Sequence, residues 1–221
     1  MRDENMLEIV NPATEETIER LEVDTAESIH GKFAGAAESR GAWQDTGLAE
    51  RMTVVRRFAS LLEEQADVLA STLTAEMGKP IVQARNELRG TLSRIEFFLD
   101  HVAEAMQPHT VLSQEDMVEE IRWEPLGVVA NVSAWNYPYF VGSNVFVPAL
   151  LTGNAVLYKP SEHATLTGLA IADLLWESGV PAATFAPIVG GGEVGGRGGL
   201  GARHVPDCRH NPDQRQRHDA A

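Results

Sequence analysis

The stretch Gly127-Val128-Val129-Ala130-Asn131-Val132 is a short run of apolar, largely β-branched residues, and it decides the fold. Runs of this length and composition are typical of strands that are buried on both faces of a parallel sheet. A second run follows at 155–158 and a third at 185–189, with helical stretches at 139–151 and 163–178 between them. Because strand and helix alternate, the sequence predicts an α/β sheet with right-handed parallel crossovers.

Upstream of this sheet, apolar residues recur every three or four positions, as they do along one face of a helix. A small hairpin is expected around Asn11-Pro12, and a first helix is expected from an Asp24–Glu27 capping box to near Gly41, with Phe33 facing inward. The second and third helices are each predicted from one apolar stripe, made of Leu48, Met52, Val55, Phe58, Leu62, Ala66 and Leu69 in one and of Val82, Leu88, Leu92, Ile95, Phe98, Leu99 and Val102 in the other. Near residues 118–123 apolar and charged residues alternate, which predicts a strand with one solvated face.

The composition excludes several classes of partner. The 221 residues are 43% hydrophobic, which allows a real core, and their net charge of −14 argues against binding to nucleic acid or to an anionic membrane. The single cysteine, Cys208, cannot form an intramolecular disulfide, and this fits a reducing cytosol. Residues 1–10 do not resemble a secretory signal, and the apolar stretch 139–151 is too short to span a bilayer. We therefore expect a soluble cytoplasmic protein.

The last part of the chain departs from this pattern. Residues 190–221 hold eight of the 19 glycines and five arginines, and they contain no Ile, Phe, Met, Trp or Tyr. A segment so poor in apolar residues is predicted to be disordered, either as a natural tail or as the product of a shifted reading frame. The frameshift is favoured because the helix expected after the third strand is missing. A zinc site made of His204, Cys208, His210 and His218 is rejected, since their spacing matches no standard site.

The segment Ser133-Ala134-Trp135-Asn136-Tyr137-Pro138 follows the first predicted strand. Ligands of open α/β sheets bind at the carboxyl ends of the strands, so the carboxamide of Asn136 could donate to a developing oxyanion there. The alternative is that Asn136 is only a turn residue before Tyr-Pro, where asparagine is common. Position and residue type alone favour neither interpretation.

Two further segments lie at predicted strand ends. In Lys159-Pro160-Ser161-Glu162 the carboxylate could accept hydrogen bonds from ribose hydroxyls and the ammonium could donate them, whereas the alternative is a solvated charged loop. The glycines from Gly190 to Gly192 could let backbone N–H groups approach a phosphate. A lone glycine run is a weak signal, and here the helix that should follow it is expected to be missing.

Taken together, the motifs resemble the aldehyde dehydrogenase superfamily, in order and spacing, from about residue 7 to 195. The matching segments are Asn11-Pro12-Ala13-Thr14, Glu76-Met77-Gly78-Lys79-Pro80, Glu124-Pro125-Leu126-Gly127-Val128, Ala134-Trp135-Asn136-Tyr137-Pro138, the stretch from Gly153 to Glu162, and Gly179-Val180-Pro181. The resemblance implies a mainly helical part at 1–109, a β-hairpin arm of the oligomerisation type at 110–125 and an incomplete Rossmann-like, dinucleotide-binding sheet at 126–195. Residues 196–221 form the predicted disordered or frameshifted tail.

The resemblance also implies a chemistry. The family oxidises an aldehyde to a carboxylic acid with NAD⁺ or NADP⁺ as the hydride acceptor, through a cysteine thiolate and a glutamate that activates water. It implies that Asn136 belongs to the oxyanion hole and that the cofactor is bound by Ser133, Ala134, Trp135, Asn136, Lys159, Pro160, Ser161, Glu162 and Gly192. A carboxylate at Glu162 would repel a 2′-phosphate, which favours NAD⁺. No metal is implied, and a homo-oligomer is expected of the intact enzyme.

The same resemblance limits what this chain is expected to do. Cys208 has neither the place nor the context of the family's nucleophile, and the segment that carries the catalytic glutamate is absent. Without the thiolate, covalent catalysis has no first step, so we expect a catalytically incomplete fragment. The alternative is a non-catalytic nucleotide-binding or regulatory remnant, which would have to tolerate an exposed sheet edge.

Overall fold

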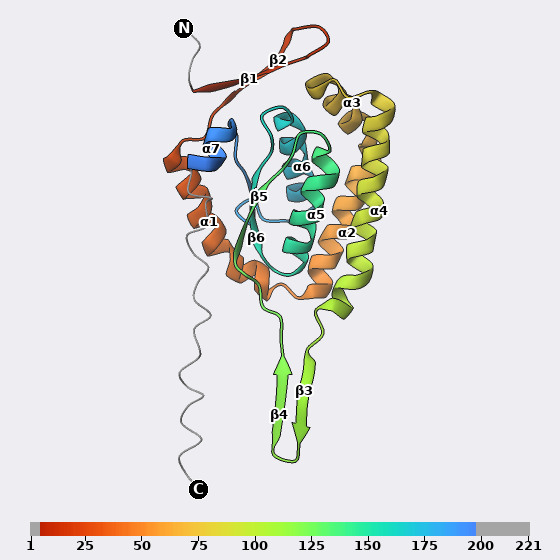
Figure 1. The fold of residues 1–221 in the computed structure, drawn as a ribbon, viewed down its shortest axis with the longest axis vertical. Coiled ribbons are helices and arrows are strands. Elements are labelled where there is room, and N and C mark those ends of the chain that lie inside the picture. Colours follow the sequence, from red (N-terminus) through yellow and green to blue (C-terminus); the bar gives the residue numbers. More distant parts are fainter. Residues whose placement is uncertain (1–4, 198–221) are drawn as a thin grey trace.

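The computed structural model describes residues 5–197. Helices surround a small parallel sheet, and two hairpins project from the body that they form (Figure 1). In chain order the elements are β1 (Met6–Val10), β2 (Thr17–Glu22), α1 (Ala26–Asp45), α2 (Leu48–Glu64), α3 (Ala66–Met77), α4 (Ile81–Ala105), β3 (His109–Gln114), β4 (Met117–Ile121), β5 (Val128–Val132), α5 (Pro138–Leu151), β6 (Ala155–Lys159), α6 (Thr165–Ser178), β7 (Phe185–Pro187) and α7 (Gly192–Arg197).

The central sheet has the strand order β5-β6-β7, and both pairings are parallel. All five residues of β6 are buried, and successive side chains face different cores. Val156 and Tyr158 belong to the larger core, which they share with residues of α2 to α6. Ala155 and Leu157 belong to a second core, together with Ile29 and other residues of α1. The predicted α/β sheet with both faces covered is thus confirmed, although β7 is shorter than the predicted strand.

The N-terminal helices differ in detail from the sequence prediction. The hydroxyl of Thr25, not the side chain of Asp24, caps α1 by accepting from the Ser28 N–H at 3.2 Å. That helix runs on to Asp45, past the predicted end at Gly41, and Phe33 on its predicted inner face is 49% exposed. The single helix predicted from Leu48 to Leu69 is two helices, α2 and α3, because the backbone leaves the helical path at Gln65.

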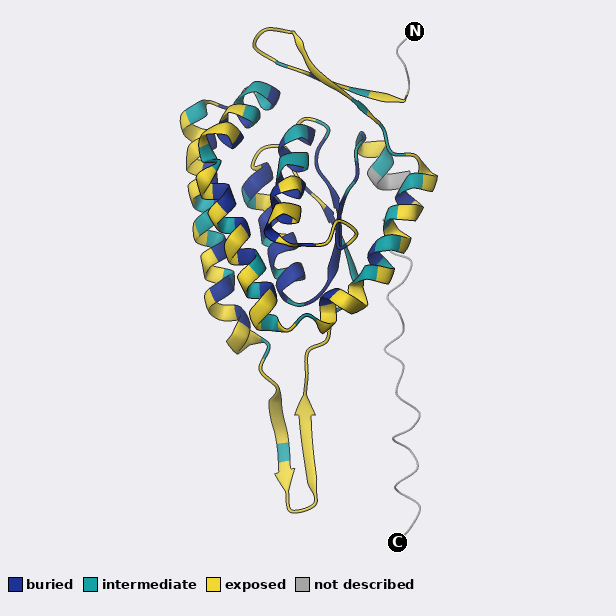
Figure 2. Cartoon of the chain, turned by 180° about the vertical axis from the view of Figure 1, so that it is seen from behind, coloured by how far each residue is buried: buried dark blue, intermediate teal, exposed yellow. Residues whose placement is uncertain are grey.

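The predicted β arm is a hairpin of β3 and β4 that extends away from the body (Figures 1 and 2). The expectation of one solvated face and one buried face was wrong. All residues of β4 are exposed, and in β3 only Leu112 is partly covered. The alternation of Val118 and Ile121 with charged residues therefore does not mark a core-facing strand within this chain.

The expectation that no helix follows the third strand was also wrong, since the short helix α7 begins at Gly192. The predicted tail lies outside the described residues from residue 198 onward, and so do Cys208 and the three histidines that were considered for zinc. Within residues 5–197, no helix is both long enough and apolar enough to cross a bilayer.

Candidate functional site

The carboxyl ends of the three parallel strands bring the predicted site segments together. Val132, the last residue of β5, is paired with Lys159, the last residue of β6, and the Ser133 N–H donates to the Lys159 carbonyl oxygen at 2.9 Å. On the other side of β6, the Ile188 N–H donates to the Tyr158 carbonyl oxygen at 2.8 Å. The loops that follow β5, β6 and β7 therefore start from neighbouring positions, which is where ligands of open α/β sheets bind.

A cavity of about 340 Å³ lies between these loops. Most of the residues that the sequence singled out line it, together with one that it missed, Val132: the lining consists of Val132, Ser133, Ala134, Trp135, Lys159, Ser161, Glu162 and Gly192. Asn136 and Pro160 are not in this lining, although each directly follows or precedes residues that are. The structure thus groups three sequence segments, more than fifty residues apart at their extremes, around one hollow.

Lys159 and Glu162 supply opposite charges at the cavity wall. The Lys159 side chain is 3% exposed and that of Glu162 is 36% exposed, and Lys159 Nζ lies 3.8 Å from Glu162 Oε2. Lys159 Nζ also donates to the Pro160 carbonyl oxygen at 2.8 Å. Burial lowers the pKa of the Lys159 ammonium, while the carboxylates of Glu162 and Glu193 oppose that shift. The pKa of Glu162 is lowered chiefly by a hydrogen bond from its own backbone N–H; burial opposes this shift, and the Lys159 charge adds to it.

The Ser133 hydroxyl is a polar group on the cavity wall that the described residues do not satisfy. Ser133 is 5% exposed, and its Oγ has no hydrogen-bond partner within residues 5–197. It faces Gly142 of α5, where an added Cβ would lie 3.3 Å from it. The Tyr158 hydroxyl is likewise buried without a partner within residues 5–197, and the same Cβ at Gly142 would lie 3.2 Å from it, so both hydroxyls face α5. The wall therefore offers a charge pair, whose ammonium and carboxylate suit a polyhydroxylated ligand such as a ribose.

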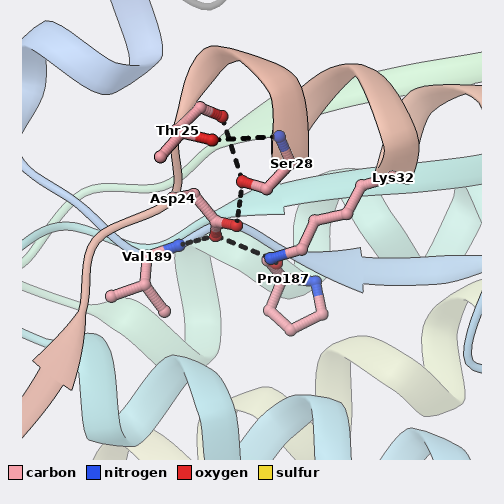
Figure 3. A network of polar contacts seen from close by, with 6 residues as sticks. All are labelled: Asp24, Thr25, Ser28, Lys32, Pro187 and Val189. Atoms are coloured by element: carbon pink, nitrogen blue, oxygen red, sulfur yellow. Dashed lines mark hydrogen bonds and ion pairs between the residues drawn. The ribbon is translucent and has the colours of Figure 1, made fainter.

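The glycine loop after β7 is held in place by the start of α1 (Figure 3). Asp24 Oδ2 accepts from the Val189 N–H at 2.8 Å and from Lys32 Nζ at 2.6 Å. The same ammonium donates to the Pro187 carbonyl oxygen at 2.7 Å, so it joins α1 to the end of β7. Gly190 directly follows, with a φ of +151° that L-residues rarely adopt. This network fixes the backbone that leads to Gly192 at the cavity.

Two carboxylates that the sequence analysis did not single out fasten the helices behind the site. Glu76 accepts from the N–H groups of Leu166 and Thr167 at the start of α6, at 2.6 and 2.9 Å. Glu87 accepts from the Tyr139 N–H at 2.8 Å at the start of α5. Both residues are nearly inaccessible, at 5% and 4% exposure. A sequence signal existed, because each glutamate occupies a core position of its helix, at helical spacing from buried apolar residues.

Asn136 itself lies on the exposed loop between β5 and α5. Its carbonyl oxygen accepts from Lys79 Nζ at 2.7 Å, across 57 residues of sequence. Within residues 5–197 its carboxamide makes no hydrogen bond, so that donor is available to a ligand. In the sequence, Lys79 stands out only as part of the Glu76–Pro80 motif. The structure brings its ammonium to the loop that carries Asn136.

The comparison with protein families identifies the fold. The model of the aldehyde dehydrogenase family matches residues 1–201 of this chain. This chain belongs to the aldehyde dehydrogenase family. The resemblance drawn from the sequence motifs is thereby confirmed, and the helices, the arm and the parallel sheet form the N-terminal part of the aldehyde dehydrogenase fold.

Several solved structures superpose on the described fold. An indole-3-acetaldehyde dehydrogenase is 29% identical with a TM-score of 0.83, and the match covers 88% of this chain and 46% of that one. An NADP-dependent enzyme of E. coli is 28% identical with a TM-score of 0.80, covering 85% and 39%. The protein PnpE, solved in complex with nicotinamide adenine dinucleotide, is 27% identical with a TM-score of 0.82, covering 87% and 40%. The matched structures thus include an NAD complex and an NADP-dependent enzyme, and this chain spans about two fifths of the length of the structures it matches.

Proposed function

We propose that residues 126–195 of this aldehyde dehydrogenase chain bind NAD⁺ or NADP⁺ in the cavity at the carboxyl ends of β5 and β6. The observation that carries the proposal is the pairing of the buried Lys159 ammonium with the partly exposed Glu162 carboxylate at 3.8 Å on the cavity wall. When bound, the dinucleotide supplies the acceptor for a hydride from an aldehyde, which is the reaction proposed for the whole enzyme.

Each predicted site residue has a role in this proposal. Glu162 accepts hydrogen bonds from the ribose hydroxyls, Lys159 donates to them, and Ser133 forms part of the wall behind them. Ser161 Oγ accepts from the His163 N–H at 3.3 Å and so stabilises the turn that presents Glu162. The remaining residues, Ala134, Trp135, Pro160 and Gly192, contribute apolar contact and close backbone approach, and Asn136 contributes its carboxamide.

NAD⁺ is the preferred cofactor in this proposal. A depressed pKa keeps Glu162 ionised at neutral pH. A second anion on the ribose 2′ position would face that carboxylate, with Lys159 already engaged by Glu162 and by the Pro160 carbonyl. Like charges at such a distance repel, so the carboxylate discriminates against a 2′-phosphate.

The aldehyde chemistry requires groups beyond the described part of the chain. Asn136 is proposed to donate to the oxyanion that forms when a thiolate attacks the aldehyde carbonyl. No cysteine lies within residues 5–197, so none of the described residues supplies that thiolate. The described residues are therefore expected to bind a dinucleotide without by themselves oxidising an aldehyde. A non-catalytic nucleotide-binding role in the cytoplasm is the second candidate, and the same observation favours it.

A titration with NAD⁺ tests the proposal. Trp135 lines the cavity and is 53% exposed, so saturable quenching of tryptophan fluorescence is expected on binding. Calorimetry of Trp135→Phe is the control, since this variant should lose most of the optical signal while retaining binding. An absence of saturable binding by calorimetry would refute the proposed site. NADH formation from NAD⁺ and an aldehyde, measured on the same material, separates the two candidates: turnover favours the enzyme, and binding alone favours the nucleotide-binding role.

A further inference from the structure

We infer that Lys79, held by the buried carboxylate of Glu87, is a positioning residue that fixes the Trp135-Asn136-Tyr137 loop and so aims the Asn136 carboxamide at the site. The inference rests on the proposed function, because it assigns the device that positions a residue of that site. It concerns two side chains that come from α4 and from the turn before it, outside the cavity lining.

The Lys79 ammonium contacts both Glu87 and the loop that carries Asn136. Nζ donates to the Asn136 carbonyl oxygen at 2.7 Å and forms an ion pair with Glu87 Oε2. It also lies 3.9 Å from the centre of the Tyr137 ring, a cation–π contact. One buried cation thus binds the backbone of Asn136 and the side chain of the next residue. The loop segment between Ala134 and Pro138 is held from one side at two successive positions.

The ion pair of Lys79 and Glu87, which supports the loop, is buried. The Lys79 side chain is 5% exposed and that of Glu87 is fully buried. Glu87 Oε1 accepts from the N–H groups of Tyr139 and Phe140, at 2.8 and 3.3 Å, so its other oxygen remains for Lys79. The carboxylate thereby caps α5 and orients the ammonium at once. A buried charge with every partner in place holds its geometry more tightly than an exposed ion pair does.

Lys79 itself lies in a tight turn between α3 and α4. It follows Gly78, which ends α3 in the left-handed conformation at a φ of +74°. A Cβ at Gly78 would lie 3.0 Å from Pro12 Cγ, so the tip of the β1–β2 hairpin packs directly against this turn. Pro80 then leads into α4. The turn has little freedom, and both the hairpin motif and the Gly-Lys-Pro motif gain a physical role from it.

The contacts of Lys79 leave the Asn136 carboxamide unengaged. The support holds the Asn136 carbonyl and the Tyr137 ring, but it does not occupy the Asn136 carboxamide, which makes no hydrogen bond within residues 5–197. An oxyanion donor is most effective when its position is fixed in advance and its N–H groups are unengaged. A loop that is fixed through its backbone meets both conditions.

The test uses three variants of the whole chain. Lys79→Met leaves the Glu87 charge buried without a cation and can unfold the protein, so the informative variant is the double substitution Lys79→Met with Glu87→Gln. The glutamine retains an oxygen for the α5 N–H groups and removes the unpaired charge. Arg85→Met is the matched control, because it removes a cation from α4, the helix that carries Glu87. Arg85 forms an ion pair with Asp67, and the side chains of this pair are 49% and 82% exposed.

Amide hydrogen exchange of the peptide spanning 133–141, compared with a peptide from α2, is the first readout. For the double variant we expect exchange in 133–141 to rise about tenfold or more, while the α2 peptide and the melting temperature stay near those of the unmodified chain. Equal acceleration in both peptides would show a general structural role and overturn the inference, and so would no change in 133–141. Arg85→Met is expected to change neither peptide.

NAD⁺ titration is the second readout and keeps this inference distinct from the proposed function. We expect the double variant to bind NAD⁺ about tenfold more weakly, because Trp135 on the same loop lines the cavity. If the unmodified chain fails to bind NAD⁺, the proposed function fails while the exchange experiment still decides whether Lys79 fixes the loop. If NAD⁺ binds both proteins equally and exchange is unchanged, the positioning role is refuted.

Discussion

Glu162 is the residue that we propose sets the cofactor preference, because its carboxylate is the acidic group of the cavity lining and lies 3.8 Å from the Lys159 ammonium. We predict that Glu162→Gln improves NADP⁺ binding by about tenfold relative to NAD⁺, since removing one like charge near the 2′ position is worth on the order of 1 kcal/mol. Parallel calorimetric titrations with the two dinucleotides measure the ratio. An unchanged ratio would mean that the 2′ position does not face this carboxylate.

Lys159 is a residue whose effects on stability and on binding have opposite signs. Burial lowers its pKa below the usual 10.5, so in the pH range between the lowered value and 10.5 the folded chain binds fewer protons than the unfolded chain. The contribution of this group to folding stability therefore rises with pH in that range. Its proposed contribution to NAD⁺ binding is expected to fall over the same range, because deprotonation removes the ammonium that is proposed to donate to the ribose.

Lys159→Met tests this opposition. We predict that the variant melts at or above the temperature of the unmodified chain at neutral pH, since a buried ammonium is replaced by an apolar side chain of similar length. NAD⁺ affinity is predicted to fall by about tenfold or more, as expected for the loss of a charge-assisted hydrogen bond. Thermal denaturation and calorimetry on the same sample measure both. A variant that loses stability and retains affinity would contradict the assignment of Lys159 as a ligand.

Residue types and strand ends were enough to predict where Lys159, Glu162 and Ser133 would lie. The sequence did not reveal Glu76 and Glu87, because their carboxylates stand in apolar stripes and bind backbone N–H groups of segments more than fifty residues away. Such partners are set by tertiary contact, which periodicity does not encode. A charged residue at a core position is nevertheless a sign that a specific buried partner exists.

At the scale of elements, the strands and helices of the sheet were predictable because their apolar runs are bounded by glycine and proline. The break between α2 and α3 was not, since Gln65 is a favourable helix residue and the stripe from Leu62 to Leu69 continues across it. Asp24 was mistaken for a cap because aspartate and threonine are both common there. The choice between Asp24 and Thr25 depends on Lys32 and Val189, which engage the aspartate in the fold.

The contact between α6 and the end of β6 is an element-scale feature that can be tested at Gly168. A Cβ at this position would lie 2.4 Å from Pro160 Cβ and 3.2 Å from the Tyr158 ring, so helix and strand approach more closely than any side chain allows. We predict that Gly168→Ala destabilises the chain by about 1–3 kcal/mol, the usual cost of overpacking a core. Because Pro160 must move, NAD⁺ affinity is also predicted to fall.

Gly31 in α1 provides the matched control for that substitution. An added Cβ there meets nothing within 4 Å, and the position is exposed in the middle of a helix. Gly31→Ala is therefore predicted to stabilise the chain by about 0.5–1 kcal/mol, since alanine loses less backbone entropy than glycine. Urea denaturation of both variants separates the effects. If Gly168→Ala were as stable as Gly31→Ala, the close approach of α6 to Pro160 would not be a constraint.

At the scale of the whole molecule, the described fold leaves two surfaces that a soluble monomer rarely shows. The edge strands β5 and β7 each have β6 on one side and no paired strand on the other within residues 5–197. The β3–β4 arm exposes Val111, Met117, Val118 and Ile121, each at least 45% accessible. A sheet edge and an apolar hairpin both favour association with another chain. The alternation predicted a strand with one solvated face and the family resemblance implied an arm, but only the fold shows that neither face of β4 is covered by the described residues.

The exposed arm gives the last prediction, which concerns the oligomeric state. We expect the chain to self-associate at micromolar concentration, and we expect Val118→Lys with Ile121→Lys on β4 to shift it toward the monomer by charge repulsion and loss of apolar contact. Sedimentation at several concentrations measures the change. Val68→Lys with Val82→Lys is the control, because these exposed valines lie on α3 and α4, away from the arm, at 66% and 62% accessibility. Because the arm makes no core of its own, neither pair of substitutions should alter the melting temperature of the monomer. If the arm variant associates as strongly as the control, the contact lies elsewhere, and the open edge of β5 becomes the surface to block.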